Sequence, residues 1–292
     1  MLMENLLSDR TDKFGWALTE CLYALPASHV PNTLLGHIPV ITLLTHLAAP
    51  NVIVDLGVAR SSVFEAVSSA VRRFNLDTSC YGIFEGSDSD ANSSIGTVLR
   101  SVSHNYPQST VIVGDAGKNA ALFDEGYVDI LTISHLSDRS SIERVVTDWL
   151  PKLSDSGIVV IATISHPSPH DPFRIFWQSI KTKYSSFDFS HQFGLGVLFV
   201  GQEQKALVRE LIENLNNNPY FSSLFSSMCE YNGVVMQERL TPQTTTPTQP
   251  PGRAVDIAER ADLLFKHSRA WKLLAPVLRK ISGFRRLEEA TR

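Results

Sequence analysis

The residues best suited to chemistry lie where apolar runs of the sequence end. One such run, 51–56, has Asp55 as its penultimate residue and is followed by Gly57, with Ser61 in the turn that leads to the next predicted helix. Glycine lets the backbone approach a ligand, and the start of a helix offers free N–H groups, so this pattern is typical of a nucleotide site. Asp55, Gly57 and Ser61 are therefore candidate cofactor-binding residues, although a plain strand-turn-helix fits the same pattern.

Two further acids follow the next two apolar runs. Glu85 comes after the run 80–84, where a carboxylate can accept hydrogen bonds from ribose hydroxyls, or it is a solvated loop acid. Asp115 comes after the run 110–113, where it can face an adenine amino group or cap the helix that follows. Both are candidate cofactor-binding residues.

Histidines and acids also gather in the loops after the fourth and fifth predicted strands. They are His135, Asp138, His166, His170 and Asp171. Imidazole and carboxylate groups suit zinc or iron, but the two prolines between His166 and His170 rule out a regular helix, and an ordinary polar loop explains the group better. We predict no metal site. The GxSxG elbow that a serine hydrolase requires is missing from the sequence.

The elements that position these residues alternate between strand and helix. Seven strand-like runs are expected, and helices are expected between several of them, most clearly at 61–74, 139–153, 173–180 and 204–215. The strands are expected at 51–56, 80–84, 110–113, 128–133, 157–163, 187–190 and 194–200. Alternation of this kind predicts a doubly wound α/β fold with a parallel sheet, and the short link between the last two strands predicts an antiparallel pair.

Composition limits the partners and the location. The net charge of −4 argues against nucleic acid, and three cysteines without a CxxC pair suit a reducing compartment. Neither a signal peptide nor an apolar run of ~18 residues is found, so a cytoplasmic protein is expected. Four segments are predicted: an N-terminal helical segment 1–48, an α/β domain 49–240, a Pro/Thr-rich linker 241–253 and a helical tail 254–292.

The tail carries a basic amphipathic pattern. Six basic residues and no acid lie within 269–286, and a tryptophan accompanies leucines at helical spacing. Such a helix can bind an anionic membrane surface, another protein or its own domain. The candidate docking residues are Trp271, Lys272, Arg279, Lys280, Arg285 and Arg286.

Several segments, taken in order, resemble one protein family. The segments Gly36-His37-Ile38-Pro39, VDLGV, CYGIF, DILTISHL, DWLPKLSDSGIVVI, FRIFWQSI and GLGVLFVG are similar to class I S-adenosylmethionine methyltransferases associated with bacterial surface-polysaccharide biosynthesis. The likeness covers about residues 30–215, and the pattern around Trp271 is similar to tails of the same proteins. It implies a Rossmann-like methyltransferase fold with a mostly parallel seven-stranded sheet, and S-adenosylmethionine as the cofactor.

The functional positions of that family are only partly kept. Asp55, Gly57 and Asp171 match. The departures are Ser61 for a glycine, Phe84 for the ribose-binding acid, Ser134 for an acid, Ser137 for a histidine, and Ala162-Thr163 for a His-Asp pair. In the family these acids and histidines bind metal or transfer protons. We therefore expect a degenerate site, with Phe84 partly occluding the space over Gly57.

Two functional hypotheses follow from this combination of matching and replaced family positions. The first is a catalytically degenerate methyltransferase-like module that binds or scaffolds glycan-assembly proteins near the membrane. The alternative is an active enzyme that methylates a hydroxyl of a sugar or glycan acceptor, with His135 or Asp171 as the proton acceptor.

Overall fold

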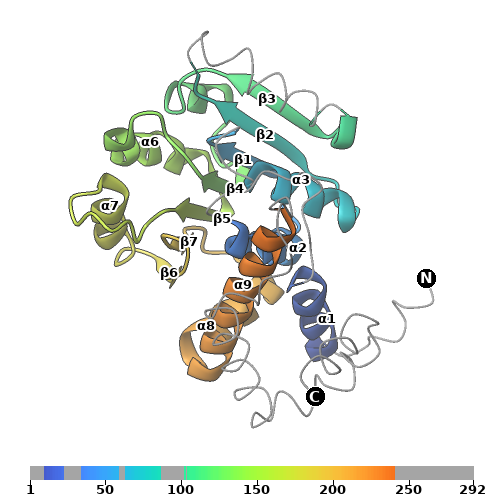
Figure 1. Cartoon of the computed structure of the whole chain (residues 1–292). Helices are drawn as coiled ribbons and strands as arrows, with labels where there is room; N and C mark the ends of the chain where they lie inside the picture. The colour runs from blue at the N-terminus through green and yellow to red at the C-terminus, as the bar shows by residue number, and fades with distance from the viewer. Residues whose placement is uncertain (1–9, 23–33, 59–62, 87–101, 103, 241–292) are drawn as a thin grey trace. The chain divides into compact units, whose positions relative to one another are not determined.

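The structure is a computed structural model that describes residues 10–22, 34–58, 63–86, 102 and 104–240. Residues Ala17–Pro242 form one compact unit, which contains the whole sheet. This sheet lies at the centre of the unit and has helices on both faces (Figure 1). None of the helices within the described ranges is long and apolar enough to cross a membrane.

Seven strands make the sheet, in the order β3-β2-β1-β4-β5-β7-β6. The strands are β1 (Val52–Leu56), β2 (Ser79–Phe84), β3 (Ser109–Val113), β4 (Val128–Ile133), β5 (Leu153–Ala162), β6 (Ser185–Phe189) and β7 (Leu195–Phe199). Neighbours from β3 to β5 pair in parallel, whereas β7 runs antiparallel to both β5 and β6. The predicted doubly wound sheet with an antiparallel strand at its end is confirmed.

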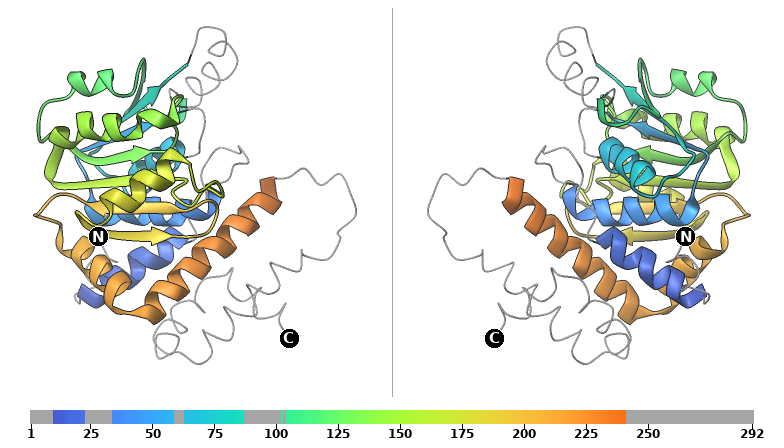
Figure 2. Two further views of the ribbon diagram at one scale, coloured as in Figure 1. Left: turned by 90° about the vertical axis from the view of Figure 1, so that its left-hand side faces the viewer. Right: turned by 90° about the vertical axis from the view of Figure 1, so that its right-hand side faces the viewer.

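Helices precede, connect and follow these strands. The α-helices are α1 (Arg10–Leu22), α2 (Ile38–Ala48), α3 (Val63–Arg73), α6 (Ile142–Trp149), α7 (Pro172–Ile180), α8 (Ala206–Asn217) and α9 (Pro219–Leu240). The short 3-10 helices are η2 (Leu35–His37), η4 (Lys118–Leu122), η5 (Arg139–Ser141) and η6 (Leu150–Lys152). Figure 2 shows α9 as one continuous helix.

The two faces of the sheet are set by alternation along its strands. Val54 and Leu56 join a core that α6 and α7 complete, with Trp149 and Trp177 among its fully buried members. The alternate residue Asp55 pairs in register with Gly82, whose own face is covered by Phe64 of α3. Because successive side chains of a strand point to opposite faces, Asp55 lies on the α3 side of the sheet.

Two elements differ from the prediction. β5 begins at Leu153 rather than 157, because Leu153 already pairs with Val128 before the register shifts, and the hydroxyl of Ser154 donates to Asp129 (2.6 Å). Helix α9 was not predicted from the sequence, since its apolar residues have no clear helical period. It packs on η2, where Gly36 and Gly233 face each other.

Candidate nucleotide site at the carboxyl edge of the sheet

The order of strands reverses between β1 and β4, and ligands of doubly wound sheets bind at such a point. Gly57 follows β1 there with a φ of +123°, a conformation that L side chains rarely adopt. A Cβ atom on Gly57 would lie 2.4 Å from the backbone nitrogen of His135. The N–H groups of Ser134 and His135 both donate to the carbonyl of Leu56 (2.9 and 3.1 Å), so the loop after β4 itself requires glycine at this position.

Asp55 lies beneath this loop and is fully buried. Its carboxylate accepts a hydrogen bond from the hydroxyl of Thr132 (2.5 Å) and a longer one from Ser134 (3.4 Å). Burial raises the pKa of Asp55 to about 7, against the lowering effect of these two hydroxyl donors. The contacts of Asp55 therefore join β1 to β4 inside the protein.

Glu85 bridges two loops that flank the strand-order reversal. One carboxylate oxygen accepts from the N–H of Ala116 after β3 (2.8 Å), and the other accepts from the N–H of Ser137 after β4 (2.9 Å). The hydroxyl of Ser137 also donates to the Glu85 carbonyl (3.2 Å). Since β2 and β1 lie between β3 and β4, the Glu85 bridge spans the carboxyl ends of the strands that would hold a nucleotide.

Phe84, the last residue of β2, is buried, and its ring lies against Gly86 in the turn after the strand. A Cβ atom on Gly86 would be only 2.1 Å from the ring. The aromatic side chain is therefore packed into the turn after β2. That Phe84 also fills the space over Gly57 stays a prediction.

Asp115 serves the chain as a local cap. Its carboxylate accepts from the N–H of Lys118 at the start of η4 (2.8 Å), and Arg144 lies 3.9 Å away. Of the two roles that the sequence left open, capping is the one for which the structure provides a partner.

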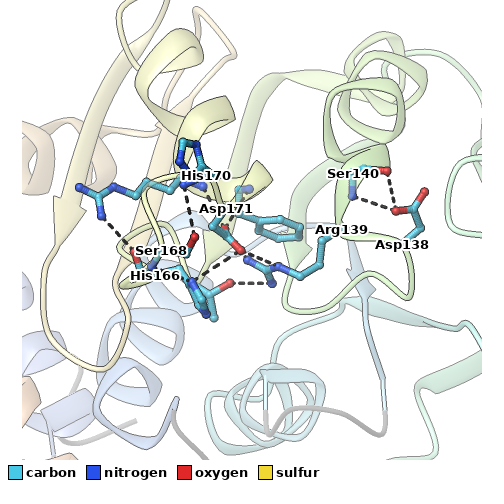
Figure 3. Close-up of polar contacts among 10 residues, drawn as sticks. Asp138, Arg139, Ser140, His166, Ser168, His170 and Asp171 are labelled. Carbon is cyan, nitrogen blue, oxygen red and sulfur yellow. Dashed lines mark hydrogen bonds and ion pairs between the residues drawn. The ribbon is translucent and has the colours of Figure 1, made fainter.

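Asp171 is held by Arg139, which sequence reasoning missed (Figure 3). Nε and Nη2 of Arg139 donate to the two carboxylate oxygens of Asp171 (2.9 and 2.7 Å), and Nη1 donates to the hydroxyl of Thr163 (3.2 Å). Asp171 also caps α7 by accepting from the N–H groups of Phe173 and Arg174. We call this set the Arg139–Asp171 clamp.

The clamp decides the protonation of Asp171. Burial acts to raise its pKa, but the hydrogen bonds from Arg139 and from the Arg174 N–H outweigh burial and lower it. A carboxylate with a lowered pKa and all these donors is a weak proton acceptor. From the sequence, Asp171 was expected in the loop after the fifth strand and Arg139 at the start of a helix, so no local pattern joined the two.

The other predicted site residues are spread along this edge. His135 is half-buried beside Gly57, and Asp138 is exposed and caps η5 by accepting from Ser140 (2.9 Å); Figure 3 shows it facing Ser140. Ser61 and the six docking residues of the tail lie outside the described residues. Within the described ranges, no three histidines, cysteines or acids are grouped closely enough to hold a metal ion.

Comparison with known proteins gives structural likeness alone. No family model and no curated protein matches the sequence. Similar solved structures include the O-methyltransferase TomG from Streptomyces achromogenes in complex with SAM (17% identity, 68% of this chain and 94% of that chain, TM-score 0.42). Others are the SAH-bound methyltransferase PaMTH1 from Podospora anserina (13%, 62% and 86%, 0.45) and a methyltransferase from Geobacter sulfurreducens (13%, 68% and 94%, 0.42).

These likenesses concern only the arrangement of helices and strands. The candidate site is described from the contacts of this chain's own residues. The strand order and the antiparallel β7 are those of the Rossmann-like methyltransferase fold that the sequence resemblance implied, and the chain has that fold.

Proposed function

We propose that this chain is a methyltransferase-like binding module that does not transfer methyl groups, and that it acts in surface-glycan assembly. The link to glycans rests on the sequence resemblance. The loss of catalysis rests on one observation: the carboxylates of Glu85 and Asp171 already accept hydrogen bonds from donors of the chain itself at both oxygens. Glu85 is bound by two backbone N–H groups, and Asp171 by Arg139 and two more.

The described residues do not fit S-adenosylmethionine. The acid that binds ribose hydroxyls is expected at the end of β2, but Phe84 stands there, and each oxygen of the following Glu85 already accepts a backbone N–H group. A nucleotide also needs free backbone N–H groups, and those of Ala116 and Ser137 are spent on Glu85. Breaking the bond from the buried Ala116 N–H to Glu85 without replacing it would leave a buried donor without that partner, at a cost of about 1–3 kcal/mol.

Titration calorimetry with S-adenosylmethionine tests the proposal. The wild-type protein is expected to give no binding heat at millimolar cofactor, while a functional methyltransferase in the same buffer shows that the ligand is intact. The Glu85→Ala variant frees the N–H groups of Ala116 and Ser137, and any gain in binding there would identify the bridge as the obstacle. Micromolar binding by the wild type would contradict the proposal.

One observation favours the alternative, an active enzyme acting on a sugar or glycan hydroxyl. The half-buried His135 lies two residues after β4 at the strand-order reversal, beside Gly57. An imidazole at that place is within reach of the ligands that such sheets bind, and a positioned base contributes ~10²–10⁴-fold to a rate. Methyl transfer that is lost in His135→Ala would establish this second hypothesis.

We further propose that the tail docks on an anionic membrane surface. Each basic residue near such a surface contributes about 1 kcal/mol, so six of them together give salt-sensitive binding. The full chain is expected to co-sediment with vesicles that contain phosphatidylserine or phosphatidylglycerol, and to lose this in Trp271→Ala/Arg279→Glu/Lys280→Glu. The variant Lys118→Glu/Lys183→Glu, altered at exposed lysines of the α/β domain, is the control and should still bind. Equal binding by both variants would contradict docking by the tail.

A further inference from the structure

The link between β6 and β7 has an unusual backbone. Gln192, Phe193 and Gly194 follow one another with φ values of +47°, +63° and +84°. Only the third is a glycine, and there a Cβ atom would lie 2.6 Å from the hydroxyl oxygen of Ser165. Left-handed conformations are unfavourable for other residues, and they persist where the surrounding structure fixes them, often at sites that bind ligands.

Contacts on both sides fix this strained turn. On one side, the N–H of Gly36 donates to the side-chain oxygen of Gln192, and a ring nitrogen of His191 lies 3.2 Å from the Gly36 carbonyl. On the other side, the N–H of Thr163 donates to the carbonyl of Gly194 (2.8 Å) and that of Ser165 to the carbonyl of Phe193 (2.7 Å). Thr163 itself has a φ of +61°, so the strain extends into the loop after β5.

The result of this arrangement is an exposed aromatic ring. Phe193 is 41% exposed, although its turn is held firmly against η2 and against the loop after β5. The carboxyl end of β6 lies at the same sheet edge as the ends of β1, β4 and β5, because β6 is parallel to them. Phe193 therefore stands at the ligand-binding edge of the fold.

Polar groups lie beside the ring. The imidazole of His166 is roughly parallel to it, with 6.1 Å between ring centroids and 29° between planes, and its side chain is 44% exposed. Nδ1 of His166 accepts from the N–H of Ser168 (3.2 Å), which assigns the proton of the neutral ring to Nε2 as a donor. Ser165 adds an exposed hydroxyl. We call Phe193, His166 and Ser165 the aromatic platform.

We infer that the aromatic platform binds a pyranose ring, an inference that rests on the proposed function and names the class of ligand it handles. A pyranose has one face of C–H groups and a rim of hydroxyls, which match the exposed aromatic ring of Phe193 and the polar groups of His166 and Ser165. Binding through one ring and few polar groups is expected in the millimolar range.

Saturation-transfer NMR on the full-length protein tests the platform, with the methyl glycosides of glucose, galactose, mannose and rhamnose as probes and no S-adenosylmethionine present. At least one glycoside is expected to receive saturation at C–H protons of one face. The transfer should be lost in Phe193→Gly, kept in Phe193→Trp and weakened about tenfold in His166→Ala. Tyr220→Ala is the matched control, since Tyr220 is a more exposed aromatic on α9, and it should behave as the wild type.

Phe193→Gly also separates a ligand-binding role from a structural one. Glycine adopts the φ of this position without strain, so the variant is expected to melt within ~3 °C of the wild type. The inference would be overturned if no glycoside received saturation, or if Phe193→Gly received as much as the wild type. Catechol serves as an additional, planar aromatic probe, and binding of catechol alone at Phe193 would also overturn it. Because S-adenosylmethionine is omitted, cofactor binding measured separately would contradict the proposed loss of catalysis and leave the platform standing.

Discussion

Arg139→Ala is expected to lower the free energy of unfolding by about 2–3 kcal/mol, because it leaves the buried carboxylate of Asp171 without its charged partner. The variant also removes the bond to Thr163 and the contact of the guanidinium with the Phe173 ring, which is 4.1 Å from its centre. Arg139→Lys keeps the charge but loses the bidentate hydrogen bonding to the Asp171 carboxylate, so its stability should lie between those of Arg139→Ala and the wild type. The free energy of unfolding of all three proteins is measured by urea denaturation.

The matched control is Arg144→Ala. Arg144 is 54% exposed, pairs with Asp148 at 3.4 Å on the surface of α6, and should change the free energy of unfolding by no more than ~0.5 kcal/mol. The two arginines also differ in pH dependence. A lowered carboxyl pKa contributes stability above its unfolded pKa and loses it as pH falls through the folded pKa, so Arg139→Ala should flatten the acid side of the stability curve. Equal effects of the two variants would contradict the clamp.

Asp55→Asn is expected to stabilise the protein in alkaline solution. The pKa of Asp55 is raised from 3.8 to about 7, so its favourable contribution is present below the unfolded pKa and is lost as pH rises through about 7. Asparagine retains an oxygen for the Thr132 hydroxyl and carries no charge to bury. The stability of the variant relative to the wild type should therefore grow by roughly 2–3 kcal/mol between about pH 5 and pH 8.5.

The difference in stability between wild type and Asp55→Asn isolates Asp55 from other buried groups. Burial also lowers the pKa of His37 to about 3, with a smaller contribution from His191 beside it, and that effect removes stability as pH falls below 6.5. His37 is present in both proteins, so its effect cancels in the difference. A difference that stays constant across this pH range would show that Asp55 ionises like a surface carboxylate.

The sequence allowed the fold to be predicted because its strand-like runs are short, apolar and separated by helix-length segments. All seven strands are where they were expected within a few residues, including the antiparallel pair. Helix α9 escaped prediction because its burial depends on η2, about 200 positions earlier in the chain. Packing between two segments so far apart in the chain produces no periodic pattern of apolar residues in the sequence.

The candidate site was predictable as a set of positions but not as a set of bonds. Gly57 was expected to make room for a ligand, and instead it makes room for the backbone of His135. Glu85 was expected to face a nucleotide or solvent, and it accepts backbone N–H groups of two loops instead. Asp115 was expected to face adenine or to cap the next helix, and it accepts the N–H of Lys118 as a cap. No site role was predicted for Arg139, because its partner Asp171 is 32 residues away and no local sequence pattern joins the two.

The exchange and chemical shifts of single backbone amides test the central claim most directly. In ¹⁵N–¹H spectra of the full-length protein, the amides of Ala116 and Ser137 should be protected from exchange while both bond to Glu85, and Glu85→Ala should remove that protection. Addition of millimolar S-adenosylmethionine should leave the amides of Gly57, Ala116 and Ser137 unshifted. Saturable shifts of all three amides, with loss of the Glu85 bonds, would contradict a site closed by the chain's own residues.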